Sequence, residues 1–391
     1  MDNEFATRNG YPRSAVTLAN WRTQPFNRWA FRNVAELVPS ARISTASPSL
    51  LPDPVSNPAM LGRTAFEGSE EKLAWFLATS QTDSFLVARD GRIICEWHAA
   101  GVDRQDPHLL FSITKSITAL VTAILEEQGF VDLSAPIGAI LPETRRGAYG
   151  DATVRQLLDM RVSLDFEEVY NSDGDYARYR RAMLWNPADP KQEDPGLFAL
   201  LCALPKGAHA HGGVHAYQSP NTDMLGTALE ELAGRRFSDL CSALLWHPLG
   251  ASADAMLTVD RFGAPRTAGG MSCRPHDLLA VGQMLLDGGK VGDQQIIPPA
   301  WLDDMRSNGD EEVWAKGSQA DFLAHGRYRS CWYQVGGASQ AYLAAGIHGQ
   351  YLYVDPESRT VIAKFASQDE PQDSLLDRQN LALFASLCAA D

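Results

Sequence analysis

The stretch HLLFSITKSITALVTAILEEQGF, residues 108–130, places Ser112 three positions before Lys115 at the start of an otherwise apolar segment. We expect a helix from about Ser112 to Gln128, because Gly129 is a good residue to end one. Positions i and i+3 share a face of a helix, so both side chains can point into the same cavity. The free backbone N–H groups at the helix start also favour a negative charge there.

This pair predicts a nucleophile and its base. A serine hydroxyl attacks poorly until a neighbouring group takes its proton, and lysine can do so when burial lowers its pKa. Apolar neighbours such as Phe111, Ile117 and Leu120 favour that burial. The alternative is a serine that caps the helix, followed by an exposed lysine, because S-x-x-K also occurs by chance.

Two further segments can complete such a site. In HAYQSPNTDMLGTALEEL, Tyr217 and Ser219 precede a helix that we expect to begin near Asn221. The Tyr217 hydroxyl, close to an ammonium, can ionise or relay protons. In AAGIHGQYLYVDP, a strand contains Gly346, where the backbone can approach a substrate and donate an N–H.

The predicted fold class is α/β (α+β), with an antiparallel sheet flanked by helices and a mainly helical insertion. Asp90-Gly91 marks a hairpin, and residues 328–337, 341–350, 351–359 and 360–367 read as strands before a closing helix. We expect residues 1–60 to form an extended N-terminal arm packed on the α/β domain. That domain comprises residues 61–135 and 236–391, with a helical domain over 136–235.

Composition excludes several classes of function. The net charge of −14 disfavours a nucleic-acid partner, and no apolar run is long enough for a membrane span. The polar N-terminus predicts a cytoplasmic protein. Six dispersed cysteines predict reduced thiols.

His209, His211 and His215 lack the ligand spacing of a metal site, and no nucleotide fingerprint appears, so we expect no metal or cofactor and a small-molecule substrate. The oligomeric state stays open, with a homodimer as one candidate.

The S-x-x-K motif at Ser112–Lys115 and the Y-x-S motif at Tyr217–Ser219 resemble those of the serine β-lactamase and penicillin-binding-protein superfamily, in its class C-like branch of esterases and amidases. The phrases NRWAF, SPNTD, GGMSC and GIHGQ are similar to the nylon-oligomer hydrolases of that branch. The resemblance implies that Ser112 is acylated, that Lys115 is its base and that Tyr217 relays protons. It also implies an oxyanion hole made by the backbone N–H groups of Ser112 and Ile347.

The same resemblance implies a substrate-binding set of Tyr170, Trp185, Ser219, Gly346 and His348, the first two on a loop that closes over the substrate. The loop carboxylate expected to bind a substrate amine is missing, because its place falls among arginines. Asp173 or Asp175 are candidates to replace it.

The strand that reads K-T-G in the family reads Ala344-Ala345-Gly346 here, without its lysine. We therefore expect hydrolysis of 6-aminohexanoate oligomers or small carboxylic esters through an acyl-enzyme. The alternatives are a carboxylesterase without amidase activity, a β-lactamase or D-alanyl peptidase, and a non-catalytic binding protein.

Overall fold

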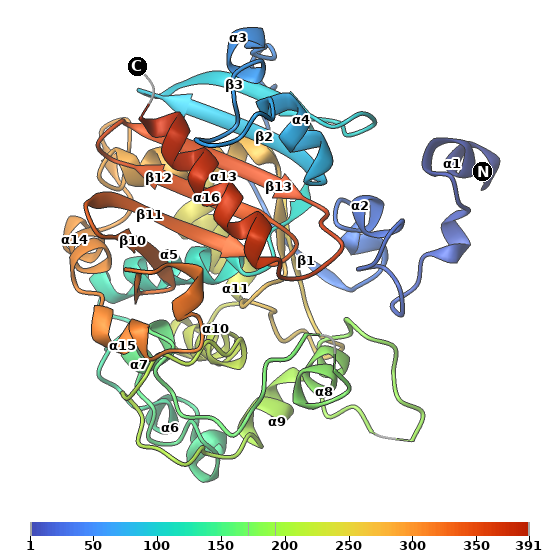
Figure 1. The fold of residues 1–391 in the computed structure, drawn as a ribbon. Coiled ribbons are helices and arrows are strands. Elements are labelled where there is room, and N and C mark those ends of the chain that lie inside the picture. The colour runs from blue at the N-terminus through green and yellow to red at the C-terminus, as the bar shows by residue number, and fades with distance from the viewer. Residues whose placement is uncertain (1, 171, 192, 390–391) are drawn as a thin grey trace.

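The larger of two main sheets combines the early and the late part of the chain. The structure, a computed structural model, describes residues 2–170, 172–191 and 193–389. The sheet is antiparallel and has seven strands (Figure 1). In order across it they are β3 (Arg92–His98), β2 (Thr82–Arg89), β13 (Thr360–Ala366), β12 (Gln350–Asp355), β11 (Ser339–Gly346), β10 (Trp332–Gly336) and β9 (Arg327–Arg329). The predicted fold class is confirmed.

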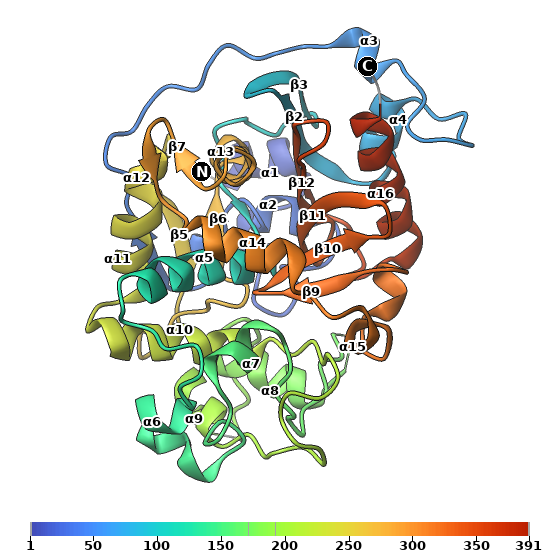
Figure 2. The same cartoon turned by 90° about the vertical axis from the view of Figure 1, so that its left-hand side faces the viewer.

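Helices cover both faces of this sheet, which leaves its central strands buried throughout. Helix α16 (Ser374–Cys388) lies on one face, and α5 (Ile113–Glu127) and α13 (Pro275–Leu286) lie on the other (Figure 2). Side chains alternate between the faces along a strand. On β12, Tyr351 packs against α16, whereas Leu352 packs against α13. This explains why β12 is apolar at consecutive positions.

A smaller sheet brings distant segments to the start of α5. Its strands, in order, are β1 (Ser40–Ile43), β5 (Ala255–Thr258), β6 (Met271–Cys273) and β4 (His108–Leu109). A separate two-stranded ribbon pairs β7 (Lys290–Val291) with β8 (Gln294–Gln295). Because β4 leads directly into α5, this sheet fixes the backbone from which Ser112 emerges.

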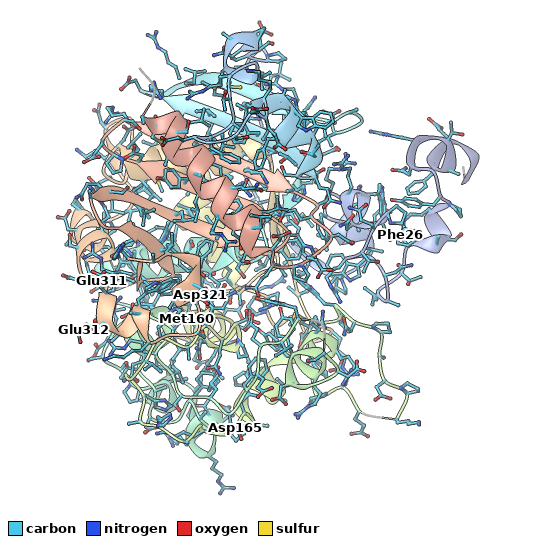
Figure 3. All side chains as sticks on the ribbon, viewed as in Figure 1. Phe26, Met160, Asp165, Glu311, Glu312 and Asp321 are labelled. Atoms are coloured by element: carbon cyan, nitrogen blue, oxygen red, sulfur yellow. The ribbon has the colours of Figure 1, made fainter. Side chains whose placement is uncertain are left out.

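The segment predicted as an extended arm over residues 1–60 contains several short helices and one strand. The segment forms α1 (Asp2–Asn9), η1 (Arg13–Ala15), α2 (Asn27–Ala30), η2 (Val34–Glu36), β1 and α3 (Pro58–Leu61). Trp21 and Phe31 are fully buried, and Phe26 packs edge-on against Tyr11 at 4.8 Å between ring centres (Figure 3). Turns bring these rings within contact of one another, and their burial stabilises the folded segment.

The remaining helices lie mostly beside or below the sheets. Between residues 136 and 235 the chain forms α6 (Ile137–Ile140), η3 (Pro142–Arg146), α7 (Val154–Leu158), α8 (Asp175–Ala182), α9 (Leu197–Cys202) and α10 (Pro220–Ala233). The others are α4 (Leu73–Thr79), α11 (Phe237–Cys241), the π-helical η4 (Ser242–Trp246), α12 (His247–Leu249), α14 (Pro299–Ser307), α15 (Glu311–Ala315) and η5 (Ala320–Phe322). Helices α6 to α9 gather on one side of the molecule (Figure 1). The domain boundaries at 135 and 236 stay a prediction.

One expected strand is in fact two. The run 328–337 turns at Ser330 and Cys331, whose φ angles of +52° and +61° are left-handed, so β9 and β10 form a hairpin. Without glycine, asparagine or proline at the turn, the sequence carried only the weak turn signal of Ser330. All six cysteines are free thiols, as predicted. No helix in the described part of the chain has both the length and the apolar character needed to cross a membrane.

Candidate active site

Ser112 directly follows a turn with a strained backbone. Gly346 of the neighbouring strand β11 packs closely against this turn. Phe111 has a φ of +46°, unusual for a side-chain-bearing residue, and α5 begins at the next residue but one. A Cβ atom on Gly346 would lie 2.5 Å from the Leu110 carbonyl oxygen and 3.1 Å from the Ser112 nitrogen. Only glycine therefore lets β11 approach this turn so closely. That requirement explains why the glycine is present although the preceding two residues depart from K-T-G.

Lys115 is buried and contacts the serine directly. Its Nζ donates to Ser112 Oγ at 2.9 Å and to the Ala268 carbonyl oxygen at 2.6 Å. Burial, aided by the positive charge of Arg266, lowers the pKa of Lys115 to about 8, against the opposing effect of Glu168. At pH 7 roughly one lysine in ten is then neutral. The arrangement can deprotonate the serine hydroxyl.

A buried ion pair holds the peptide segment to which Lys115 is hydrogen-bonded. Asp223, on α10, accepts from the Ala268 N–H at 2.7 Å and pairs with Arg266, and Tyr179 also donates to its carboxylate. Asp223 and Arg266 are both nearly inaccessible to solvent. The carboxylate thus holds the peptide segment whose carbonyl accepts from Lys115. Sequence reasoning missed this pair, although a charged residue on the buried face of the predicted helix after Ser219 indicates a buried partner.

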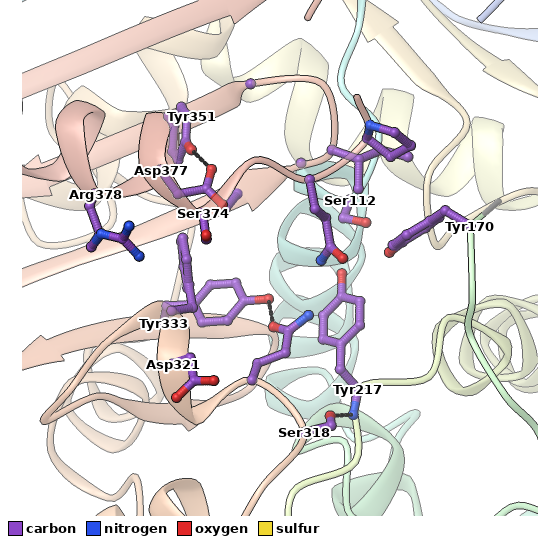
Figure 4. A pocket seen from close by; sticks show the side chains of 18 residues that line it. Ser112, Tyr170, Tyr217, Ser318, Asp321, Tyr333, Tyr351, Ser374, Asp377 and Arg378 are labelled. Atoms are coloured by element: carbon purple, nitrogen blue, oxygen red, sulfur yellow. Dashed lines mark hydrogen bonds between the residues drawn. The ribbon is translucent and has the colours of Figure 1, made fainter. Parts of the chain in front are cut away.

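Tyr217 lines the same cavity as Ser112, which lies at the start of α5. Its hydroxyl points toward Ser112 (Figure 4), and its ring lies 5.0 Å from the Lys115 Nζ. Burial raises the pKa of Tyr217 well above its usual value, although the interaction with Ser112 acts in the other direction. The sequence left open whether this tyrosine ionises. The structure places it where the neutral phenol is favoured, which suits a proton relay.

Glu168 is the second residue that sequence reasoning missed. Its Oε1 accepts from the Ser219 hydroxyl at 2.7 Å and from the Tyr170 hydroxyl at 3.1 Å, and its Oε2 accepts from the Ser219 N–H. Ser219, which was predicted to bind substrate, is therefore buried, and its hydroxyl and backbone N–H are both bound to Glu168. The sequence DFEEVY holds two adjacent glutamates, of which Glu167 is exposed and Glu168 is half-buried. The sequence alone does not indicate which of the two enters the site.

Of the residues expected to bind substrate, all but Ser219 line one or both of two cavities. The first, of about 220 Å³, is lined by Ser112, Tyr170 and Tyr217 together with the strand end at Gly346 and Ile347 (Figure 4). The second, of about 370 Å³, shares Tyr170 and Ile347 with the first but not Ser112.

Trp185 and His348 line the second cavity and not the first. The indole N–H of Trp185 donates to Thr258 Oγ1 at 3.3 Å, and the ring is buried. Nδ1 of His348 lies 2.7 Å from the Gln368 carbonyl oxygen, and its left-handed backbone, at φ +63°, turns the chain after Ile347. Neither residue borders the serine cavity.

Two candidate amine-binding carboxylates lie outside both cavities. Asp173 is exposed, and Asp175 accepts a long hydrogen bond, of 3.4 Å, from the Glu167 N–H. Among the residues that the structure describes, no three His, Cys, Asp or Glu side chains are grouped to hold a metal ion. His211 contacts Ala148 and Asp151, and His215 is buried elsewhere, between Trp314 and Tyr328.

The Beta-lactamase family model matches residues 78–386, most of the chain. The chain belongs to this family. Within it, the 6-aminohexanoate-dimer hydrolase of Paenarthrobacter ureafaciens is 32% identical over 368 residues, covering 92% of this chain and 91% of the relative. The resemblance expected from Ser112–Lys115 and Tyr217–Ser219 is confirmed, and the chain is a serine hydrolase of the β-lactamase fold.

Solved β-lactamase-fold structures agree with this architecture. A Bacillus anthracis protein provisionally classed as a 6-aminohexanoate-dimer hydrolase superposes with a TM-score of 0.87 at 23% identity, over 96% of this chain and 97% of its own. A class C β-lactamase from Rhodobacter sphaeroides gives 0.55 at 14% identity, over 80% and 97%. At these identities the likeness speaks for the fold alone.

Proposed function

We propose that this β-lactamase-family enzyme cleaves short linear amides, such as 6-aminohexanoate oligomers, and small carboxylic esters through an acyl-enzyme at Ser112. The observation that carries the proposal is the 2.9 Å contact between Lys115 Nζ and Ser112 Oγ in a buried setting. The 32% identical relative, named a 6-aminohexanoate-dimer hydrolase, supports the choice of substrate. A cytoplasmic location and a homodimer stay predictions.

The proposed reaction uses the three side chains in turn. Neutral Lys115 takes the hydroxyl proton as Ser112 Oγ attacks the carbonyl carbon. The backbone N–H groups of Ser112 and Ile347 donate to the oxyanion. Tyr217 gives its proton to the leaving amine or alcohol as the C–N or C–O bond breaks, and the proton that Lys115 took from Ser112 replaces it. Water then attacks the carbonyl carbon of the acyl-enzyme and loses a proton to the same side chains. Ser112 Oγ regains a proton as its bond to the acyl group breaks, which releases the acid and the free serine.

The missing strand lysine argues against β-lactam or D-alanyl peptide substrates. In the family that lysine holds a substrate carboxylate, and its place is taken here by Ala344, which is fully buried. No cation replaces it at that position of β11. A linear amide or ester needs no such contact beside the oxyanion strand.

The proposal is tested by measuring amine release from linear 6-aminohexanoate dimer and hydrolysis of a short-chain p-nitrophenyl ester. Ser112→Ala should abolish both activities. Ser116→Ala is the matched control on the same helix, because its hydroxyl donates to the Cys331 carbonyl oxygen at 2.7 Å, away from the reaction. This control should keep turnover at a modest cost in stability.

The outcomes separate the alternatives. Ester cleavage alone identifies a carboxylesterase on this scaffold, and penicillin turnover identifies a β-lactamase. A stable acyl adduct on Ser112 without turnover identifies a binding protein. Activity that survives in Ser112→Ala would refute the assignment of the nucleophile.

A further inference from the structure

The second cavity lies beside the oxyanion strand and is lined by arginines. It shares Tyr170, Ile347 and Pro371 with the serine cavity, so a chain bound across the strand end at Ile347 can reach both. Arg22 of the N-terminal segment and Arg180 of α8 line it. Segments 158 residues apart in sequence thus bring two arginines to the lining of the second cavity.

Neither arginine forms an ion pair with an acid in the described part of the chain, although the more distant Asp173 carboxylate favours the charged form of Arg180. Arg22 donates to the Trp185 carbonyl oxygen and to Asn186 Oδ1, both at 2.6 Å, and Arg180 donates to the Tyr170 carbonyl oxygen at 2.8 Å. All of these acceptors are uncharged, and no ion pair involves either arginine there. Burial and the charge of Arg180 lower the pKa of Arg22 to about 9, which still leaves it a cation at neutral pH.

One donor nitrogen near this cavity also lacks a partner. Arg180 Nε is buried without a hydrogen bond in the described structure. An unpaired buried donor is costly, and a bound acceptor removes that cost. The acidic residues that line the cavity, Asp369 and Glu370, are exposed. They therefore lie in high dielectric, which weakens their effect on the two half-buried arginines.

We propose that this arginine-lined cavity binds a carboxylate at one end of the substrate. The inference rests on the proposed function and deepens it, because it selects amides that carry a free carboxylate on one half over those ending in an ammonium or a methyl group. Guanidinium groups bind carboxylates through charge-assisted hydrogen bonds, often in pairs. The linear dimer of 6-aminohexanoate has such a carboxylate, at the end of its amine half.

The test uses two matched series of amides. In one, the acyl half is a six-carbon chain ending in carboxylate, methyl or ammonium, on butylamine; in the other, the same three groups end a six-carbon amine half on a hexanoyl group. kcat/KM is measured for wild type, Arg180→Met, Arg180→Lys and Arg178→Met. Arg178 is the control, because it lies on α8 but is exposed and outside this cavity.

We expect the carboxylate compound of one series to exceed its methyl counterpart by roughly tenfold or more, the effect of one charge-assisted hydrogen bond. Arg180→Met should reduce that ratio to near one. Arg180→Lys should restore part of the ratio, and Arg178→Met should keep all of it. Equal or better use of the methyl or ammonium compounds in both series would overturn the proposal, as would a ratio that survives Arg180→Met.

Binding to Ser112→Ala, measured by calorimetry with the same compounds, tests the cavity without turnover. If wild type cleaves none of the amides, the proposed amidase function fails. The cavity assignment then depends on whether the carboxylate compound binds more tightly than the methyl compound and loses that advantage in Ser112→Ala/Arg180→Met. Equal binding of the two compounds would refute the cavity assignment separately.

Discussion

Glu168 binds Ser219 through both the backbone N–H and the side-chain hydroxyl of the serine. The same carboxylate accepts from the Tyr170 hydroxyl at 3.1 Å. One side chain therefore ties the segment that carries Tyr170 to the start of α10, next to Tyr217. Its negative charge also favours the ammonium form of Lys115. Glu168 is thus a positioning residue that sets both the geometry and the protonation of the site.

The pH dependence of hydrolysis should report Lys115. Only the neutral amine can take the serine proton, so kcat/KM should rise with pH through an apparent pKa near 8. Glu168→Gln removes the charge that raises this pKa, and the acid limb should therefore move to lower pH. The measurement is a pH–rate profile of ester hydrolysis for wild type and variant.

The adjacent Glu167→Gln is the control for this shift. Glu167 is exposed, and burial rather than distance along the chain decides how strongly a charge acts on the lysine. Its profile should coincide with that of wild type. An acid limb in Glu168→Gln that stays in place or moves to higher pH would contradict the electrostatic role of Glu168.

Gly346→Ala should cut kcat/KM by about 10² to 10³, the effect of losing one oxyanion donor. The new methyl group would lie 3.1 Å from the Ser112 nitrogen and 2.5 Å from the Leu110 carbonyl oxygen, so the turn must shift. Gly213→Ala is the control, since its nearest contact would be an ordinary 3.6 Å and its φ is not left-handed. Full activity in Gly346→Ala would show that the Ser112 N–H is not used.

The proposed catalytic trio could be predicted because each member carries a local signal. Ser112 and Lys115 share a helical face, so their spacing alone suggested that they meet, whereas Tyr217 was added from its place before a helix and from the family resemblance. The strand glycine was equally visible. Local patterns of this kind survive in the folded chain, where the distance from Lys115 to Ser112 depends on one helical turn.

The residues that were missed depend on long-range packing. Glu168 reaches Ser219 across 51 positions, and Arg266 reaches Asp223 across 43. Trp185 was expected on a loop that closes over the substrate but is buried against Trp21, at 5.3 Å between ring centres. That contact depends on the N-terminal segment being folded, which its proline- and asparagine-rich composition did not indicate.

Asp223→Asn should destabilise the fold by about 3–5 kcal/mol, because it leaves the Arg266 guanidinium buried without a counter-charge. Chemical denaturation measures the loss. Asp165→Asn is the control, since Asp165 is exposed and forms only a backbone hydrogen bond, and its effect should stay within about 0.5 kcal/mol. Equal stability of Asp223→Asn and wild type would show that the pair is not required.

Tyr217→Phe should retain the fold and lose about 10² to 10⁴ in kcat, because the phenol is the group placed to protonate the departing amine or alcohol. The loss should be larger for amides than for p-nitrophenyl esters, whose leaving group needs no proton. Tyr342→Phe is the matched control, a buried tyrosine on β11 that borders neither cavity. If amide and ester hydrolysis fall by the same factor, Tyr217 acts on the attacking serine rather than on the leaving group, and the relay must be reassigned to Lys115.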